Sequence, residues 1–214
     1  MALERRKVLF GEPVEATGDA ERDALATAVK AIEAREGERR GWDQPPRLFS
    51  LHLADIDSGA IELRIIPPRQ WASGHRNPAD DLAAWAMRYP APGPVTPLAF
   101  ADSPDGFAGI AMMYEGWAAP DDAKLSPEEE ARRALGERTF TQRSDRVEVR
   151  MVTAVDINGH SYLLRRLRGR EVELAVTAAD PDSSVRNIGE ARGKLPHAIG
   201  RIAHAVRTGA LVLG

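Results

Sequence analysis

Apolar residues recur along this chain with two periods, one typical of helices and one typical of strands. In residues 20–36 and again in about 195–207, apolar positions are spaced four and three apart, which predicts two amphipathic helices. We expect the first helix to begin after Asp19, a good N-cap, and to stop at Gly37. Asn77-Pro78 predicts another helix start, and Ser126 with Glu129 forms a capping-box pattern before a short helix.

Strand patterns fill most of the remaining chain. Residues 48–53 alternate apolar and polar positions, and 61–66 form a second run that Pro67-Pro68 ends. Residues 107–117 are apolar at nearly every position, which predicts a central strand covered on both faces. Two alternating runs within 147–168 flank Asn158-Gly159, the pattern of a hairpin with a two-residue type I′ turn.

That turn would fix the register of the hairpin. It would place Ile157 opposite His160 and Met151 opposite Arg166, so that Arg166 and Arg168 share a face with Met151 while Arg165 lies on the other.

These elements predict an α+β fold, an antiparallel or mixed sheet with helices packed on it, because single strands and a hairpin lie between terminal helices. Residues 1–18, charged and then rich in Gly and Pro, are predicted to be an N-terminal arm, and 19–214 a single domain. The segment 90–106 holds five prolines and should be an extended connector.

Composition narrows the class of protein. The chain has 214 residues, 43% apolar and 29% charged, as expected for a globular domain. It has no cysteine, which excludes disulfides and thiolate chemistry and fits a reducing compartment. No apolar run is long enough for a signal peptide or a membrane span, so we expect a cytoplasmic protein without a membrane partner. A net charge of −3 argues against nucleic acid as a partner.

Catalytic motifs are missing from the sequence. It contains neither a G-x-S-x-G nucleophile elbow nor a phosphate-binding glycine loop. His197 and His204 are about 10 Å apart along a helix, too far to share a metal ion, and fit a solvated helix face. His160 lies at the predicted turn and should be exposed. We therefore predict no catalytic residues, no metal and no cofactor.

Two segments remain as candidate binding sites. The first is GWDQPPRLF, where Pro45-Pro46 stiffens the approach to a strand. Its Trp42 fits a clamp that packs the first helix on the sheet, as large aromatic residues often do. Alternatively, Trp42, Asp43, Gln44 and Arg47 form a recognition surface on a rigid loop.

The second candidate is the basic arm of the hairpin, which carries Arg165, Arg166 and Arg168. One interpretation is an edge strand kept soluble by charge. The other is a site for a small anionic or phosphate-bearing ligand, because guanidinium groups make forked contacts with such anions.

The motifs GWDQPPRLF, FAGIAMMYEGWAAP, DRVEVRMVTAVDINGHSYLLRRLRG and LPHAIGRIA together resemble a family of small uncharacterised actinobacterial proteins. The resemblance runs from the first helix to the end of the chain and implies a single intracellular domain from an actinobacterium or an actinophage. It implies no activity. The sequence departs from the family between 54 and 100, where it reads RIIPPRQWASGHR.

The sequence favours a non-enzymatic protein that binds a protein partner or a small ligand. The alternatives are an enzyme of unidentified class, which should show a deep pocket with convergent polar groups, and an actinophage structural or accessory component. Because open sheets must protect their edges, we also expect a homodimer that pairs through an exposed strand.

Overall fold

The computed structural model describes residues 5–7, 19–55, 57–73, 77–118, 126–134, 144–177, 186–187 and 194–213. Its elements are, in order, β1 (Arg5–Lys7), α1 (Ala20–Arg40), β2 (Arg47–Asp55), β3 (Ala60–Ile66), α2 (Pro68–Trp71), α3 (Pro78–Ala86), β4 (Pro94–Val95), the 3-10 turns η1 (Phe100–Asp102) and η2 (Pro104–Gly106), β5 (Phe107–Ala118), α4 (Pro127–Ala134), β6 (Val147–Asp156), β7 (Ser161–Leu167), β8 (Val172–Thr177), β9 (Arg186–Asn187) and α5 (Lys194–Arg207). The predicted α+β fold is confirmed.

One antiparallel sheet organises these elements, with its seven strands in the order β1-β3-β2-β5-β6-β7-β8. β5 is the middle strand, and its residues from Phe107 to Met113 are all buried, as expected for a central strand covered on both faces. Three residues of the predicted N-terminal arm form β1 and pair with β3, so they cover that edge of the sheet.

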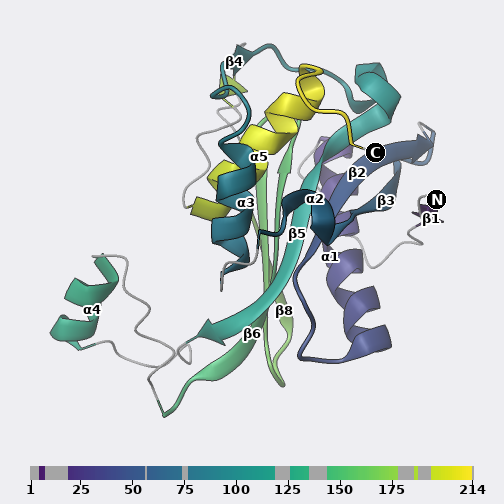
Figure 1. Cartoon of the computed structure of the whole chain (residues 1–214). Coiled ribbons are helices and arrows are strands. Elements are labelled where there is room, and N and C mark those ends of the chain that lie inside the picture. The colour runs from purple at the N-terminus through teal and green to yellow at the C-terminus, as the bar shows by residue number, and fades with distance from the viewer. Residues whose placement is uncertain are drawn as a thin grey trace.

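Helices cover both faces of the sheet. α1 lies on one face, while α5, with α3 packed on it, lies on the other (Figure 1). The predicted apolar stripe of α5 is confirmed, since Leu195, Ile199 and Ile202 are buried. Burial of each such side chain stabilises the fold by about 1.5–3 kcal/mol, so the stripe accounts for much of the docking of α5.

The predicted helix starts are confirmed by their caps. The Asp19 side chain accepts a hydrogen bond from the amide of Arg22 at 3.1 Å. Ser126 and Glu129 form the reciprocal capping box, in which each side chain accepts from the backbone amide of the other.

The predicted end of the first helix is wrong. α1 continues through Gly37 to Arg40 and ends at Gly41, which takes φ 67°. A glycine inside a helix is tolerated at modest cost, whereas the left-handed conformation at a helix end favours glycine strongly.

The predicted hairpin turn is also wrong, by one residue. Val155 pairs with Ser161 and Met151 pairs with Arg165, so the loop has three residues, 157–159. Only Gly159 takes a positive φ there, at 86°, whereas a type I′ turn needs two such residues. The Asp156 carboxylate explains the difference, because it accepts the amides of Asn158 and His160 at 2.8 and 2.9 Å and so fixes the longer loop.

The shift of register exchanges the faces of the arginines. Arg166 now lies opposite Arg150 on the α1 face of the sheet, and Arg165 lies on the α5 face opposite Met151. His160, expected at the surface, is only 4% exposed. Its ring Nδ1 lies 2.6 Å from the Asp156 carboxylate, so the turn is anchored by a buried polar group. His204, expected on a solvated helix face, is half-buried.

Candidate functional site

The two predicted binding segments meet at one end of the sheet, on the α1 face. Two guanidinium groups stack on the ring of Trp42, whose centroid lies 4.7 Å from Cζ of Arg150 and 5.6 Å from Cζ of Arg168. Beside it, the backbone amide of Gln44 donates to the Glu115 carboxylate at 2.9 Å. The loop and the hairpin arm therefore form one cluster, although each was predicted separately.

Arg150 of β6 is the centre of this cluster and is only 1% exposed. Its guanidinium donates to Glu33 of α1 at 3.2 Å, to Glu115 of β5 at 2.7 and 2.9 Å, and to the carbonyl of Gly41. A buried charge is stable only when it is paired and hydrogen-bonded in this way. The network therefore ties the C-terminal half of α1 to the middle of the sheet.

The predicted arginines are all held by carboxylates of the chain itself. Arg47 donates to Glu36 at 2.6 Å, Arg165 pairs with Glu173, Arg166 with Glu33 at 3.1 Å, and Arg168 with Glu148. Asp43 is exposed and takes φ 68°. Because these cations are neutralised internally, the cluster offers little net positive charge to an anionic ligand. A binding role for these residues stays a prediction.

Trp42 does not pack as the clamp interpretation requires. It is half-buried, and it is not part of the apolar core between α1 and the sheet. Its ring instead covers Arg150, so the tryptophan shields an ion network from water.

A pocket lies on the opposite face of the sheet, beyond the C-terminal end of α5. We call it the tail pocket, and its volume is about 230 Å³. Its walls are Ser50, His52, Arg64, Ile65 and Ile66 from β2 and β3, Pro104, Asp105 and Phe107 around η2, and Val206, Gly209, Leu211, Val212 and Leu213 from α5 and the tail that follows it. Sequence segments more than 150 residues apart therefore build one cavity.

Two buried polar side chains face this mainly apolar cavity. Ser50 is 2% and His52 6% exposed. The Nδ1 atom of His52 lies 3.1 Å from the backbone oxygen of Asp105, and its ring packs edge-on against Phe107. Burial, and to a smaller degree the nearby Arg64 guanidinium, lower the pKa of His52. The ring is therefore neutral at neutral pH.

Asp105 contacts both His52 and Arg64 on the polar side of the tail pocket. Its φ of 54° is unusual for a residue other than glycine and stores strain. In this conformation its carbonyl faces His52 while its carboxylate accepts from Arg64. Arg64 also donates to Glu62 at 2.9 and 3.2 Å, so its charge is divided between two carboxylates.

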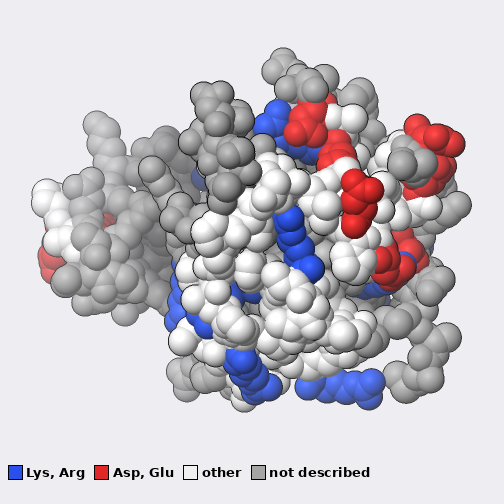
Figure 2. Space-filling view, turned by 90° about the horizontal axis from the view of Figure 1, so that it is seen from above, with Lys and Arg blue, Asp and Glu red and all other residues white. Residues whose placement is uncertain are grey.

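The surface around this end of the molecule is mostly uncharged. Viewed from above, uncharged side chains cover much of the face, basic side chains lie near its middle and along its lower edge, and acidic side chains gather toward the upper right (Figure 2). Exposed carboxylates lie in η1 and η2 before β5, at Asp102 and Asp105, and at the end of β2 and just after it, at Asp55 and Asp57. The charged side chains that line the tail pocket are Arg64 and Asp105, which pair with each other.

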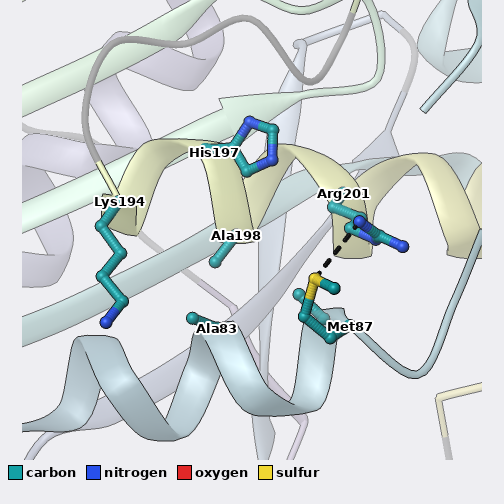
Figure 3. A pocket seen from close by; sticks show the side chains of 7 residues that line it. Ala83, Met87, Lys194, His197, Ala198 and Arg201 are labelled. Atoms are coloured by element: carbon teal, nitrogen blue, oxygen red, sulfur yellow. Dashed lines mark hydrogen bonds between the residues drawn. The ribbon is translucent and has the colours of Figure 1, made fainter. Parts of the chain in front are cut away.

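A second hollow of about 330 Å³ lies between α3 and α5. Ala83 and Ala198 face each other across it, Lys194 stands at one end and Met87 with Arg201 at the other, and His197 points away from α3 (Figure 3). Lys194 is paired with Asp80, and Arg201 donates to the carbonyl of Tyr89 at 3.0 Å and to the Met87 sulfur at 3.5 Å. With its cations engaged and a floor of alanines, this groove has fewer groups that can recognise a ligand than the tail pocket.

The described residues contain no group of three or more histidine or acidic side chains placed to hold a metal ion. None of the helices in this part of the chain is long and apolar enough to cross a membrane. No protein-family model, curated protein or solved structure matches the chain. The resemblance to actinobacterial proteins thus rests on the sequence motifs alone.

Sequence reasoning missed the tail pocket. The only local signal was the pair of polar residues, Ser50 and His52, on one side of an otherwise apolar strand. Such alternation ordinarily marks a solvated face, and here residues around η2, the end of α5 and the tail after it turn that face into a cavity wall.

Proposed function

We propose that the chain is a binding protein for a small, mainly apolar molecule and that the tail pocket holds it. The observation that carries the proposal is the placement of two buried polar side chains, Ser50 and His52, against a mainly apolar cavity. Ligand sites generally combine apolar walls with a few well-placed polar groups. Burying a serine and a histidine has a cost in stability, which a ligand-binding role would explain.

The strain at Asp105 supports the same proposal. Residues in unusual backbone conformations concentrate at functional sites, where the surrounding structure holds them. Asp105 lies on the rim of the tail pocket, and its conformation sets the direction of His52. Asp43, also at positive φ, instead lies beside the internally neutralised arginine cluster.

The test measures how far small aromatic and aliphatic compounds raise the Tm of the parent protein and of two variants, in each of which a large side chain fills one cavity. Leu211→Trp places a large side chain in the tail pocket, whereas Ala83→Phe fills the groove between α3 and α5 and serves as the matched control. We expect compounds that raise the Tm of the parent to raise that of Ala83→Phe equally and to have no effect on Leu211→Trp. Stabilisation that is lost in Ala83→Phe but kept in Leu211→Trp would contradict the proposal.

An enzyme is the second candidate, and one observation favours it. A neutral imidazole whose Nδ1 is held by a carbonyl leaves Nε2 available, which is the arrangement a general base needs. The binding role is preferred because the Ser50 hydroxyl is directed to the carbonyl of Arg64, at 3.5 Å, and not to His52.

A further inference from the structure

The hydrogen-bonding state of His52 restricts what the tail pocket can recognise. Its Nδ1 lies 3.1 Å from the backbone oxygen of Asp105, and a carbonyl oxygen can only accept. Nδ1 therefore carries the proton. Because burial lowers the pKa of the ring, Nε2 keeps its lone pair at neutral pH and can only accept a hydrogen bond.

The charges that face His52 do not favour an anion. Arg64 donates to the carboxylates of Glu62 and Asp105. The groups near His52 therefore comprise one guanidinium and two carboxylates, and the neutral His52 ring contributes no charge. Their net charge is negative. The part of α5 and the tail that lines the pocket brings no charged side chain. A carboxylate or phosphate placed here would meet net negative charge and would lose its hydration without a partner.

The volume and the apolar walls of the pocket restrict the size and polarity of the remainder of the ligand. Ile66, Phe107, Leu211 and Leu213 give it an apolar lining. An apolar cavity of about 150 Å³ is known to hold benzene. The tail pocket, at about 230 Å³, has room for a ring with one or two small substituents.

We propose, building on the ligand-binding role above, that the tail pocket takes a neutral hydroxyl compound, whose apolar body lies against the tail and whose hydroxyl group donates to Nε2 of His52. A phenol or a short-chain alcohol has this chemistry. Anions, and apolar molecules without a donor, do not.

The experiment uses four probes with one ring and different substituents: p-cresol, p-xylene, p-toluate and 4-methylbenzylamine. Each is titrated into the full chain labelled with ¹⁵N, and the histidine ring nitrogens are followed by NMR. We expect p-cresol to bind at least tenfold more tightly than p-xylene, p-toluate to bind most weakly, and the Nε2 resonance of His52 to shift on addition of p-cresol.

A variant pair separates the hydroxyl contact from the cavity. His52→Phe keeps a ring against Phe107 but removes the lone pair, so the preference for p-cresol over p-xylene should fall to about one while p-xylene still binds. His197→Phe, in the groove between α3 and α5, should leave the preference unchanged. If His52→Phe does not fold, the relative affinities of the four probes for the parent protein still show whether the pocket prefers a hydroxyl compound.

The outcomes distinguish this proposal from the broader one. Equal binding of p-cresol and p-xylene would overturn the hydroxyl class and leave the ligand-binding role intact. If p-toluate or 4-methylbenzylamine bound most tightly, the proposal of a hydroxyl ligand would be overturned in favour of a charged ligand. Failure of all four probes to bind up to their solubility would overturn both proposals.

Discussion

The guanidinium of Arg150 in β6 lies directly against the backbone of Gly37 in α1. A methyl group added at position 37 would come within 2.6 Å of the Arg150 Nη1 atom. Gly37 was expected to end the helix, but it instead provides the space in which a buried cation meets Glu33 and Glu115. The missing side chain of Gly37 thus leaves room for this guanidinium at the α1–sheet interface.

Gly37→Ala should destabilise the protein, although the same change inside most helices stabilises by about 1 kcal/mol. Any shift of the Arg150 guanidinium would strain its hydrogen bonds to Glu33, Glu115 and Gly41, so overpacking should lower the free energy of unfolding by about 1–3 kcal/mol. Urea unfolding measures the difference.

The control for this prediction is the same change in an Arg150→Lys background. Lysine keeps the charge but lacks the Nη1 atom, so Gly37→Ala should then be neutral or stabilising. A parent protein made more stable by Gly37→Ala would show that the contact does not restrict the helix.

Trp42→Ala should lower the free energy of unfolding by about 1–2 kcal/mol, the range expected for a partly shielded cation–π contact. A fully buried tryptophan would cost about 3–5 kcal/mol. Trp117→Ala is the matched control, because Trp117 is 41% exposed and stacks on Arg146 at 4.3 Å. Trp117→Ala should lower the free energy of unfolding by less than Trp42→Ala does. A loss above 3 kcal/mol for Trp42→Ala would restore the clamp interpretation.

Stability should fall as the pH is lowered from 7.5 to 5.5. The pKa values of His52 and His204 are both lowered by burial, with nearby Arg64 and Arg207 acting in the same direction. Near and below the ordinary value of 6.5, the unfolded chain therefore binds more protons than the folded chain, and acid favours unfolding. One such group changes stability by at most about 1.4 kcal/mol per pH unit.

His52→Gln should remove the share of this pH dependence that His52 contributes, leaving the share of His204. Unfolding free energies at a series of pH values measure the slope, and His197→Gln, which removes an exposed histidine, is the control. A steeper fall in His52→Gln than in the parent would contradict the assignment.

The sequence predicted most of the elements because their signals are local. Caps at Asp19 and Ser126, the apolar stripe of α5 and the uniformly apolar β5 each follow from neighbouring residues. The hairpin register failed because Asn158-Gly159 carries a strong two-residue signal, while the competing interaction comes from the side chain of Asp156. A carboxylate that accepts two loop amides outweighs the preference of the dipeptide.

The candidate site was harder to predict because its parts are distant in sequence. The loop at Trp42 and the arginines at 165–168 were recognised separately, and their contact follows from β6 and β7 lying beside the end of α1. The tail pocket depends on where residues 209–213 pack, which no local pattern encodes.

The homodimer stays a prediction, and the sheet offers one candidate surface for it. β1 covers the β3 edge of the sheet, whereas no described strand covers the outer edge of β8. We expect light scattering to give a dimer mass at low micromolar concentration, at both low and high salt, since backbone pairing is not screened. Ala175→Lys, at an exposed position of β8, should give a monomer. A monomeric parent under all conditions would contradict the prediction.

The position of a bound molecule tests the ligand-binding account most directly. Intermolecular NOEs between p-cresol and methyl-labelled protein report which residues lie within a few ångströms of the ring. We expect NOEs to the methyl groups of Ile66, Leu211 and Leu213, which line the tail pocket. NOEs to Ala83 and Ala198 instead would place the molecule between α3 and α5 and contradict the account.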